Sequence, residues 1–337
     1  MSEIFLYFFA FLASFIISAA AQPLARRYLF FILKDSPTQL KNHEGTVPST
    51  GGAALALGFF AALLLVRFMT NFPSGTLHNL RGIFFGGTII FALGVIDDIK
   101  KPKGLNAYVK LFFQIIAALI LIKYDISIKL FGAPYDCILS VLWIAGLTNA
   151  FNLIDIMDGL AVSQAVLASL AFALISLPSE FIYVNFAALA LCGAALGFWP
   201  YNHAKKLKTF LGDGGSTLLG FILAALALGA QYSAKNPWAV FVPILILIIP
   251  IFDTCFVSVA RLAKGISPLR GTNDHFPLRL MRAGLSKKNI VLFAALAALS
   301  YDALAFWITK ADATVATIIY AVVIADIAAF AIFLRNK

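Results

Sequence analysis

The sequence predicts an all-α integral membrane protein that crosses the bilayer many times. The chain is 61% hydrophobic and only 12% charged, and its mean hydropathy is +0.91. A soluble globule of 337 residues needs more polar surface than this composition supplies. Long apolar runs recur along the whole chain, which lacks the alternating ten-residue segments of a β-barrel. We therefore expect ten or eleven transmembrane helices in one integral domain, residues 1–337.

Eleven apolar runs are the candidate spans, with ends placed to within about 2–4 residues. They cover residues 4–20, 50–66, 82–96, 111–122, 138–150, 160–177, 181–201, 216–232, 238–259, 290–307 and 313–333. The fifth and sixth runs are the least clearly separated, so ten spans is the alternative count. The first run ends in AAAQ, as a signal peptide does, but Glu3 precedes it and Arg26 and Arg27 follow it. We therefore expect an uncleaved first span.

The basic residues indicate the orientation of these spans. If the N-terminus lies outside the cell, twenty Lys and Arg residues fall on one side of the membrane and six on the other. The richer side is then cytoplasmic, in a cell (inner) membrane. The net charge of +10 gathers on this face, where it can meet anionic headgroups or an anionic substrate. No nucleic-acid partner is expected, because these residues lie in short loops without a binding module.

Acidic and amide side chains cluster at three places on the predicted cytoplasmic face. The segments are GVIDDIKKPKG with Asp97 and Asp98, NAFNLIDIMDGLA with Asn149, Asn152, Asp155 and Asp158, and FLGDGGS with Asp213. Any one of these acids alone is explained equally well by a solvated loop. Carboxylates at a membrane boundary are costly unless they are hydrated, paired or metal-bound, so acids gathered from three loops predict a shared cation site.

Two further segments suit phosphate binding. Ser216 opens an apolar run just after GDGG, and backbone N–H groups at such a helix start can receive an anion. A glycine-rich turn with a serine N-cap explains the same letters. The longest inner loop holds His275 and Arg279, which suit phosphate oxygens, although inner loops carry positive charge in any case.

Five motifs, in this order and on one predicted face, resemble the polyprenyl-phosphate N-acetylhexosamine-1-phosphate transferases of glycosyltransferase family 4. They are DSPTQLKNHEGTVPSTGG, GVIDDIKKPKGLNAYVKLFFQ, NAFNLIDIMDGLA, FLGDGGSTLLGF and IPIFDTCFVSVARLAKGISPLRGTNDHF. This family includes undecaprenyl-phosphate GlcNAc-1-phosphate transferases and phospho-MurNAc-pentapeptide translocases. The resemblance is strongest over residues 35–285.

The resemblance implies a reaction and its partners. The phosphate of undecaprenyl phosphate attacks the β-phosphorus of a UDP-N-acetylhexosamine, giving an undecaprenyl-diphosphate sugar and UMP. The reaction needs Mg²⁺, with Mn²⁺ as the alternative ion, and it starts a cell-envelope glycan such as a cell-wall polymer or a lipopolysaccharide O-antigen. Such enzymes sit among membrane lipids, and the resemblance leaves a homodimer open.

The resemblance also implies roles for individual residues. Asp213 resembles the Mg²⁺ ligand, with Asn152 as a second contact. The expected catalytic residues are Asp97, Asp98, Asp155, Asp158 and His275, and the expected substrate-binding residues are Lys41, His43, Lys101, Lys110, Asn149, Asn202 and Arg279. Asp97 resembles the acid that deprotonates or orients the lipid phosphate. A phosphate monoester has a second pKa near about 6 and is largely ionised at pH 7, so either role stays open.

This chain departs from the family pattern at two places. Ile156 stands where a glycine is common, and Pro277 and Leu278 stand where further histidines are common. We expect GlcNAc as the donor sugar rather than the MurNAc-pentapeptide. A Mg²⁺-dependent intramembrane prenyltransferase is the alternative enzyme, and a secondary transporter is the alternative from another class. Asp253, after Pro250, is expected to be a structural partner at a helix break.

Overall fold

The computed structural model describes residues 3–35, 47–72, 74–177, 182–233, 236–267 and 272–335. The chain falls into two compact units, Met1–Ala230 and Gln231–Lys337. The expectation that both belong to one integral domain stays a prediction.

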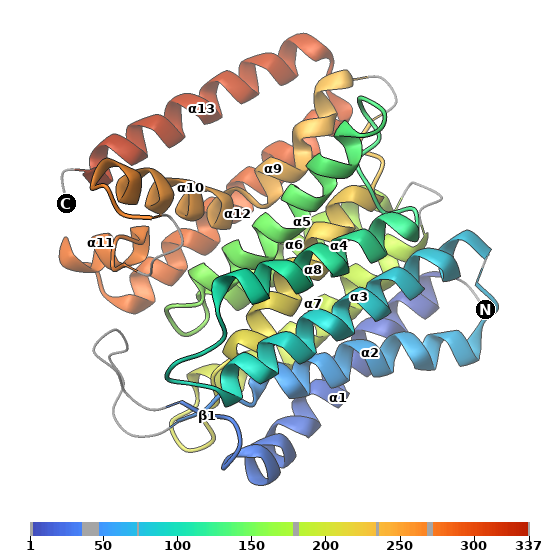
Figure 1. Cartoon of the computed structure of the whole chain (residues 1–337). Coiled ribbons are helices and arrows are strands. Elements are labelled where there is room, and N and C mark those ends of the chain that lie inside the picture. Colours follow the sequence, from blue (N-terminus) through green and yellow to red (C-terminus); the bar gives the residue numbers. More distant parts are fainter. Residues whose placement is uncertain are drawn as a thin grey trace. The chain divides into compact units, whose positions relative to one another are not determined.

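The first unit is a bundle of helices around α8. Its elements are α1 (Glu3–Leu29), β1 (Lys34–Asp35), β2 (Val47–Pro48), α2 (Gly51–Met69), α3 (Ser74–Ile99), α4 (Ala107–Lys123), α5 (Tyr135–Ile154), α6 (Leu160–Ser176), α7 (Ile182–His203) and α8 (Gly212–Gly229). The two strands form one short antiparallel pair. Helix α8 packs against α2, α3, α5, α6 and α7. It is buried along nearly its whole length, so the core of this unit surrounds it (Figure 1).

The second unit contains a broken helix. Its elements are η1 (Pro237–Phe241), α9 (Val242–Ile246), α10 (Ile248–Ala263), α11 (Phe276–Arg282), α12 (Lys287–Lys310) and α13 (Ala313–Arg335). The segment formed by η1 and α9 is bent by 76° relative to α10. The break lies at Leu247 because Pro250 has no N–H for the carbonyl of Ile246, and its ring crowds that carbonyl. The apolar run 238–259 is therefore a bent pair instead of one continuous helix.

The membrane-protein fold class is confirmed. In the described part of the chain, eight helices are long and apolar enough to cross a membrane, or nine if the bent pair is one span. Within the described residues, each of the eleven predicted runs overlaps at least one helix. Two of these helices, α4 and α6, have 17 residues each and stand at the lower limit for a span. The count of ten or eleven is reached only if these short helices are included. Outward-facing Phe112 and Leu142 are exposed, as lipid-facing residues are.

Candidate active site

Three aspartates and two lysines meet at one end of the first unit. Asp97 and Asp98 lie at the end of α3, Lys101 in the turn that follows, Lys110 in the first turn of α4, and Asp213 in the first turn of α8. Lys101 forms ion pairs with Asp98 and, at 2.9 Å, with Asp213. Lys110 forms ion pairs with Asp97 and, at 3.4 Å, with Asp213. We call these five residues the aspartate–lysine cluster.

Asp98 holds the start of α8 in place. Its carboxylate accepts hydrogen bonds from the backbone N–H groups of Asp213 (3.1 Å) and Gly214 (3.0 Å). The first N–H groups of a helix have no partner within the helix, and a carboxylate satisfies both their hydrogen bonds and the positive end of the helix dipole. Asp98 is 3% exposed. A side chain of α3 therefore caps α8, across more than a hundred residues of sequence.

Glycines allow the helices to approach closely enough for this cap. A Cβ at Gly94 of α3 would collide with the backbone of Gly214, and a Cβ at Gly52 of α2 would collide with the backbone of Gly215. Gly212 itself has a φ of +72°, which L-residues rarely adopt. The glycines of GDGGS are thus required by close packing and by backbone conformation at the point where Asp213 enters the cluster.

The cluster carries an excess of negative charge, because three carboxylates face two ammonium groups. Burial opposes the charged form of Lys101, but the carboxylates of Asp213 and Asp98 outweigh this effect and raise the pKa of the ammonium group above its usual value. Lys101 is therefore a fixed positive charge at neutral pH. It can bind a phosphate oxygen in place of a carboxylate oxygen.

The donor set of the cluster fits a hard divalent cation. Within the described ranges, no group of three His, Cys, Asp or Glu side chains is arranged to hold a metal ion. Mg²⁺, however, is usually bound by one or two carboxylates, with waters and substrate phosphates completing the shell. Asp213 supplies carboxylate oxygens, and Asn152 lies nearby because its amide donates to Ser216 Oγ at 3.0 Å, one turn along α8. These residues would suit an ion that binds together with a phosphate substrate.

The four polar residues of NAFNLIDIMDGLA point to different partners. Helix α5 ends at Ile154, so Asn149 and Asn152 lie on the helix and Asp155 is its C-cap. Asn149 exchanges two hydrogen bonds with Gln114 of α4, at 2.8 and 3.1 Å. This reciprocal pair links α4 to α5, whereas Asn152 faces α8. The polar side chains of this one segment therefore contact several elements.

Asp158 and Asn202 tie the end of this motif to the loop after α7. Asp158 forms an ion pair with Lys208. Asn202 accepts a hydrogen bond from Gly159 N at 2.6 Å and donates to the carbonyl of Thr209 at 3.2 Å. Gly159 has a φ of +82° and turns the chain into α6. Sequence reasoning missed Lys208, since three lysines occur within KKLK and no local signal distinguishes the one that pairs.

Ile156 does not disturb this turn. The described non-glycine residues with positive φ do not include it, and its N–H donates to the carbonyl of Ile154 at 2.8 Å. The turn needs a glycine at position 159 but not at 156. The backbone therefore accommodates Ile156 at the place where a glycine is common.

In the second unit, His275 precedes the short basic helix α11, and Arg279 lies within it. His275 Nδ1 lies 2.6 Å from Asp253 Oδ2, and Asp253 Oδ1 accepts a hydrogen bond from Phe276 N at 2.9 Å. Asp253, which is fully buried, thus anchors the start of α11. This contact explains why a carboxylate is tolerated in α10, six residues after the break at Leu247.

Arg279 is held by Asp274 and by the end of α13. Its guanidinium lies 3.2 Å from the Asp274 carboxylate and donates to the carbonyl of Leu334 at 3.0 Å. Burial alone would raise the pKa of Asp274, but hydrogen bonds from Lys264 and Thr272 and nearby positive charges hold it below its usual value. No signal in the sequence distinguishes Asp274, because an acid in a basic loop is usually expected to be solvated.

The roles expected for these residues stay predictions. The structure brings Asp97, Asp98, Asp213, Lys101 and Lys110 together and places Asn152 beside them. Asp158 pairs with Lys208, and Asn149 pairs with Gln114. Lys41 and His43 lie outside the described residues.

Comparison with known proteins identifies related sequences. Residues 80–231 match the family model described as Glycosyl transferase family 4, and all five cluster residues lie in this range. A Bacillus subtilis (strain 168) protein named "Probable undecaprenyl-phosphate N-acetylglucosaminyl 1-phosphate transferase" is 31% identical over 294 residues, which cover 84% of this chain and 79% of that protein.

Two more relatives carry different names. A "Decaprenyl-phosphate N-acetylglucosaminephosphotransferase" of Mycolicibacterium smegmatis is 29% identical, over 76% of this chain and 70% of that protein. A "Phospho-N-acetylmuramoyl-pentapeptide-transferase" of Streptococcus mutans is 31% identical, over 73% of this chain and 77% of that protein. The chain is thus similar along most of its length to transferases named for different sugar donors.

Proposed function

Because this chain belongs to glycosyl transferase family 4, we propose that it transfers an N-acetylhexosamine 1-phosphate from a UDP-sugar to undecaprenyl phosphate. A phosphate oxygen of the lipid forms a bond to the β-phosphorus of the UDP-sugar. The bond between this phosphorus and the bridging oxygen breaks, and UMP leaves with the electron pair. The product is an undecaprenyl-diphosphate sugar, which starts a cell-envelope glycan.

The aspartate–lysine cluster is the observation that carries this proposal. Phosphoryl transfer needs correctly placed charges more than covalent help from the protein. Lys101 and Lys110 bind phosphate oxygens when these replace the Asp213 oxygens that the two lysines now contact. Asp97 lies beside Lys110, where it orients the lipid phosphate or accepts its remaining proton. Asp98 keeps α8 and Lys101 in position.

The remaining site residues have narrower proposed roles. Asp213 and Asn152 would hold Mg²⁺, or Mn²⁺ as the alternative, and the bound ion would neutralise charge on the diphosphate oxygens. Asp155, Asp158 and Asn202 contact the nucleotide. In the second unit, His275 and Arg279 bind phosphate oxygens. The aspartate–lysine cluster of the first unit faces the cytoplasm of the cell.

GlcNAc is the proposed donor sugar. The names of the B. subtilis and M. smegmatis relatives support it. In addition, the short basic helix has Pro277 and Leu278 at positions where a pentapeptide translocase is expected to have further histidines. The name of the S. mutans relative makes the MurNAc-pentapeptide the competing donor.

The direct test uses purified full-length protein, undecaprenyl phosphate, Mg²⁺ and a panel of UDP-N-acetylhexosamines, with UMP as the measured product. We expect UMP release with UDP-GlcNAc and loss of activity in EDTA. We also expect Asp213→Asn to lower kcat by about 100-fold or more, since even partners of metal ligands contribute about 10–100-fold. Asp326→Asn is the matched control, because Asp326 lies on α13 and pairs with Tyr301 instead.

The outcomes separate the alternatives. Free diphosphate instead of UMP would identify a prenyltransferase. Full turnover by Asp213→Asn would remove the metal assignment, and turnover only with the UDP-MurNAc-pentapeptide would replace GlcNAc as the donor.

A further inference from the structure

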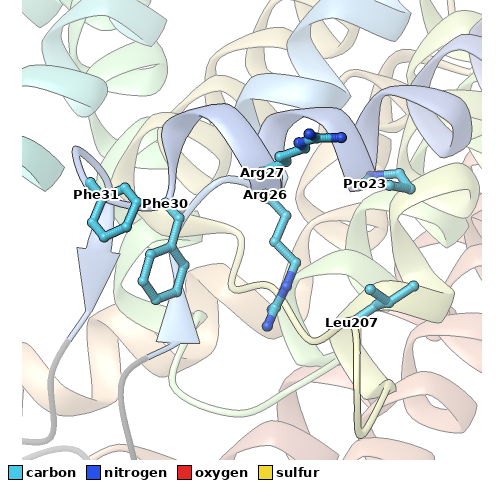
Figure 2. Close-up of a pocket in the computed structure, with 6 residues that line it drawn as sticks. All are labelled: Pro23, Arg26, Arg27, Phe30, Phe31 and Leu207. Atoms are coloured by element: carbon cyan, nitrogen blue, oxygen red, sulfur yellow. The ribbon is translucent and has the colours of Figure 1, made fainter.

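We infer that a hollow at the end of α1 binds the phosphate headgroup of an anionic membrane phospholipid. The hollow has a volume of about 340 Å³. Its lining residues are Pro23, Arg26, Arg27, Phe30, Phe31 and Leu207 (Figure 2). Five of the six come from the end of α1 and the turn after it, and Leu207 comes from the loop after α7. None belongs to the aspartate–lysine cluster, and the inference does not depend on the proposed reaction.

Two guanidinium groups line this hollow, and its lining includes no acid among the residues that the structure describes. Arg26 Nη1 donates to the carbonyl oxygen of Lys208, which ties the end of α1 to the loop after α7. Arg27 lies over the ring of Tyr28, 5.7 Å from its centre. Neither arginine forms an ion pair with an acid in the described part of the chain. Among the described residues, the hollow therefore keeps the positive charges of both arginines.

Aromatic side chains form the other wall. Phe30 and Phe31 pack edge to face with ring centres 5.4 Å apart, and Phe31 is 83% exposed. Figure 2 shows Arg26 extending between Phe30 and Leu207. Helix α1 is a candidate membrane span, so its last turn lies at the depth where headgroups meet acyl chains. At this depth the exposed phenyl ring can contact acyl chains while the two guanidinium groups contact headgroups.

The two guanidinium groups favour a phosphate-containing lipid as the ligand of the hollow. A guanidinium group donates two parallel hydrogen bonds to a phosphate, and anionic lipids are drawn to basic residues at the membrane surface. The volume stands near the lower end of the range of about 300–1,000 Å³ for small-molecule sites, which suits a headgroup better than a nucleotide sugar. An arginine that only reaches toward water explains the charge, but it does not explain the tie to Lys208 or the phenyl wall.

The test measures lipid retention by the full-length protein. The protein is exchanged into nanodiscs of phosphatidylcholine with a minor fraction of phosphatidylglycerol, released, and analysed by native mass spectrometry. We expect wild type to retain phosphatidylglycerol over phosphatidylcholine by about tenfold or more. Arg26→Gln with Arg27→Gln abolishes this preference. Arg27→Gln alone reduces this preference several-fold and keeps the hydrogen bond from Arg26 to the Lys208 carbonyl. If the double variant unfolds, this single variant still tests the inference.

Arg67→Gln is the matched control, because it removes the same charge from the exposed end of α2. It should retain phosphatidylglycerol as wild type does. The inference fails if Arg27→Gln keeps the full preference for phosphatidylglycerol. It also fails if Arg67→Gln lowers this preference as much as Arg27→Gln does. It also fails if inorganic phosphate displaces the lipid at equal headgroup concentration, which would make the ligand a free anion. Stronger retention of undecaprenyl phosphate than of phosphatidylglycerol would assign the hollow to that carrier lipid instead.

Discussion

Asp97 and Asp98 are neighbours in sequence with different surroundings. Asp98 accepts two backbone N–H groups from the start of α8 and pairs with Lys101. Asp97 accepts one backbone N–H, from Leu105, and pairs with Lys110. Both are almost fully buried. These contacts are consistent with a positioning role for Asp98 and with the proposed role of Asp97 in orienting the lipid phosphate or accepting its proton.

Asn substitutions should separate these two roles. Asp98→Asn replaces one acceptor oxygen by a donor, so one N–H of α8 loses its partner. We expect the free energy of unfolding to fall by about 1–3 kcal/mol, seen as a lower melting temperature in detergent. Asp97→Asn keeps an oxygen for Leu105 and should lower kcat by about 100-fold, with a smaller change in melting temperature. Equal melting temperatures for wild type and Asp98→Asn would contradict the capping role.

At the scale of elements, the position of α8 depends on glycines at its first turn. Gly94 of α3 and Gly52 of α2 each meet the backbone of this turn, at Gly214 and Gly215. Backbone atoms cannot move aside by changing rotamer, so a methyl group there must push the helices apart. The distance from Asp98 to α8 is set by this packing.

Gly94→Ala should therefore weaken both the fold and the activity. We expect a loss of about 1–3 kcal/mol in stability, as in other overpacked cores, together with a fall in kcat. Gly146→Ala is the matched control, because a Cβ at Gly146 of α5 meets nothing within 4 Å and alanine favours helix. The control should be at least as stable as wild type. Equal behaviour of the two variants would show that the close approach of α3 and α8 does not matter.

At the scale of the whole molecule, the distribution of charge predicts which side of the membrane each loop occupies. With the N-terminus outside, twenty of the twenty-six Lys and Arg residues fall on the side predicted to be cytoplasmic. The residues of the aspartate–lysine cluster lie at or beside helix ends that are predicted to be inside. The orientation is therefore directly linked to the proposed use of a cytoplasmic UDP-sugar.

Cysteine labelling tests this orientation. In a chain with Cys137, Cys192 and Cys255 replaced, Lys103→Cys and Asn71→Cys place one thiol at each of two exposed loop positions. In right-side-out vesicles, a membrane-impermeant maleimide should label position 71, and it should label position 103 only after the membrane is opened. The reverse pattern would overturn the predicted topology.

Much of the fold was predictable, because hydrophobic length is a local property. In the described part of the chain each apolar run overlaps a helix, and the run at 238–259 is broken near Pro250. The candidate site was predictable less completely. The three acidic segments were recognised, but the pairing of Asn149 with Gln114, of Asp158 with Lys208 and of His275 with Asp253 was not. Each pair joins residues from different elements.

Apolar length, charge bias and short motifs are local properties of the chain, so the class of protein and the family could be predicted from them. Which charges meet depends on how the helices pack. Lys101 and Asp213 are 112 residues apart, and they pair because α3 and α8 pack without side chains at Gly94 and Gly214. Such pairing depends on the distance between whole helices, and the local sequence around either residue does not encode that distance.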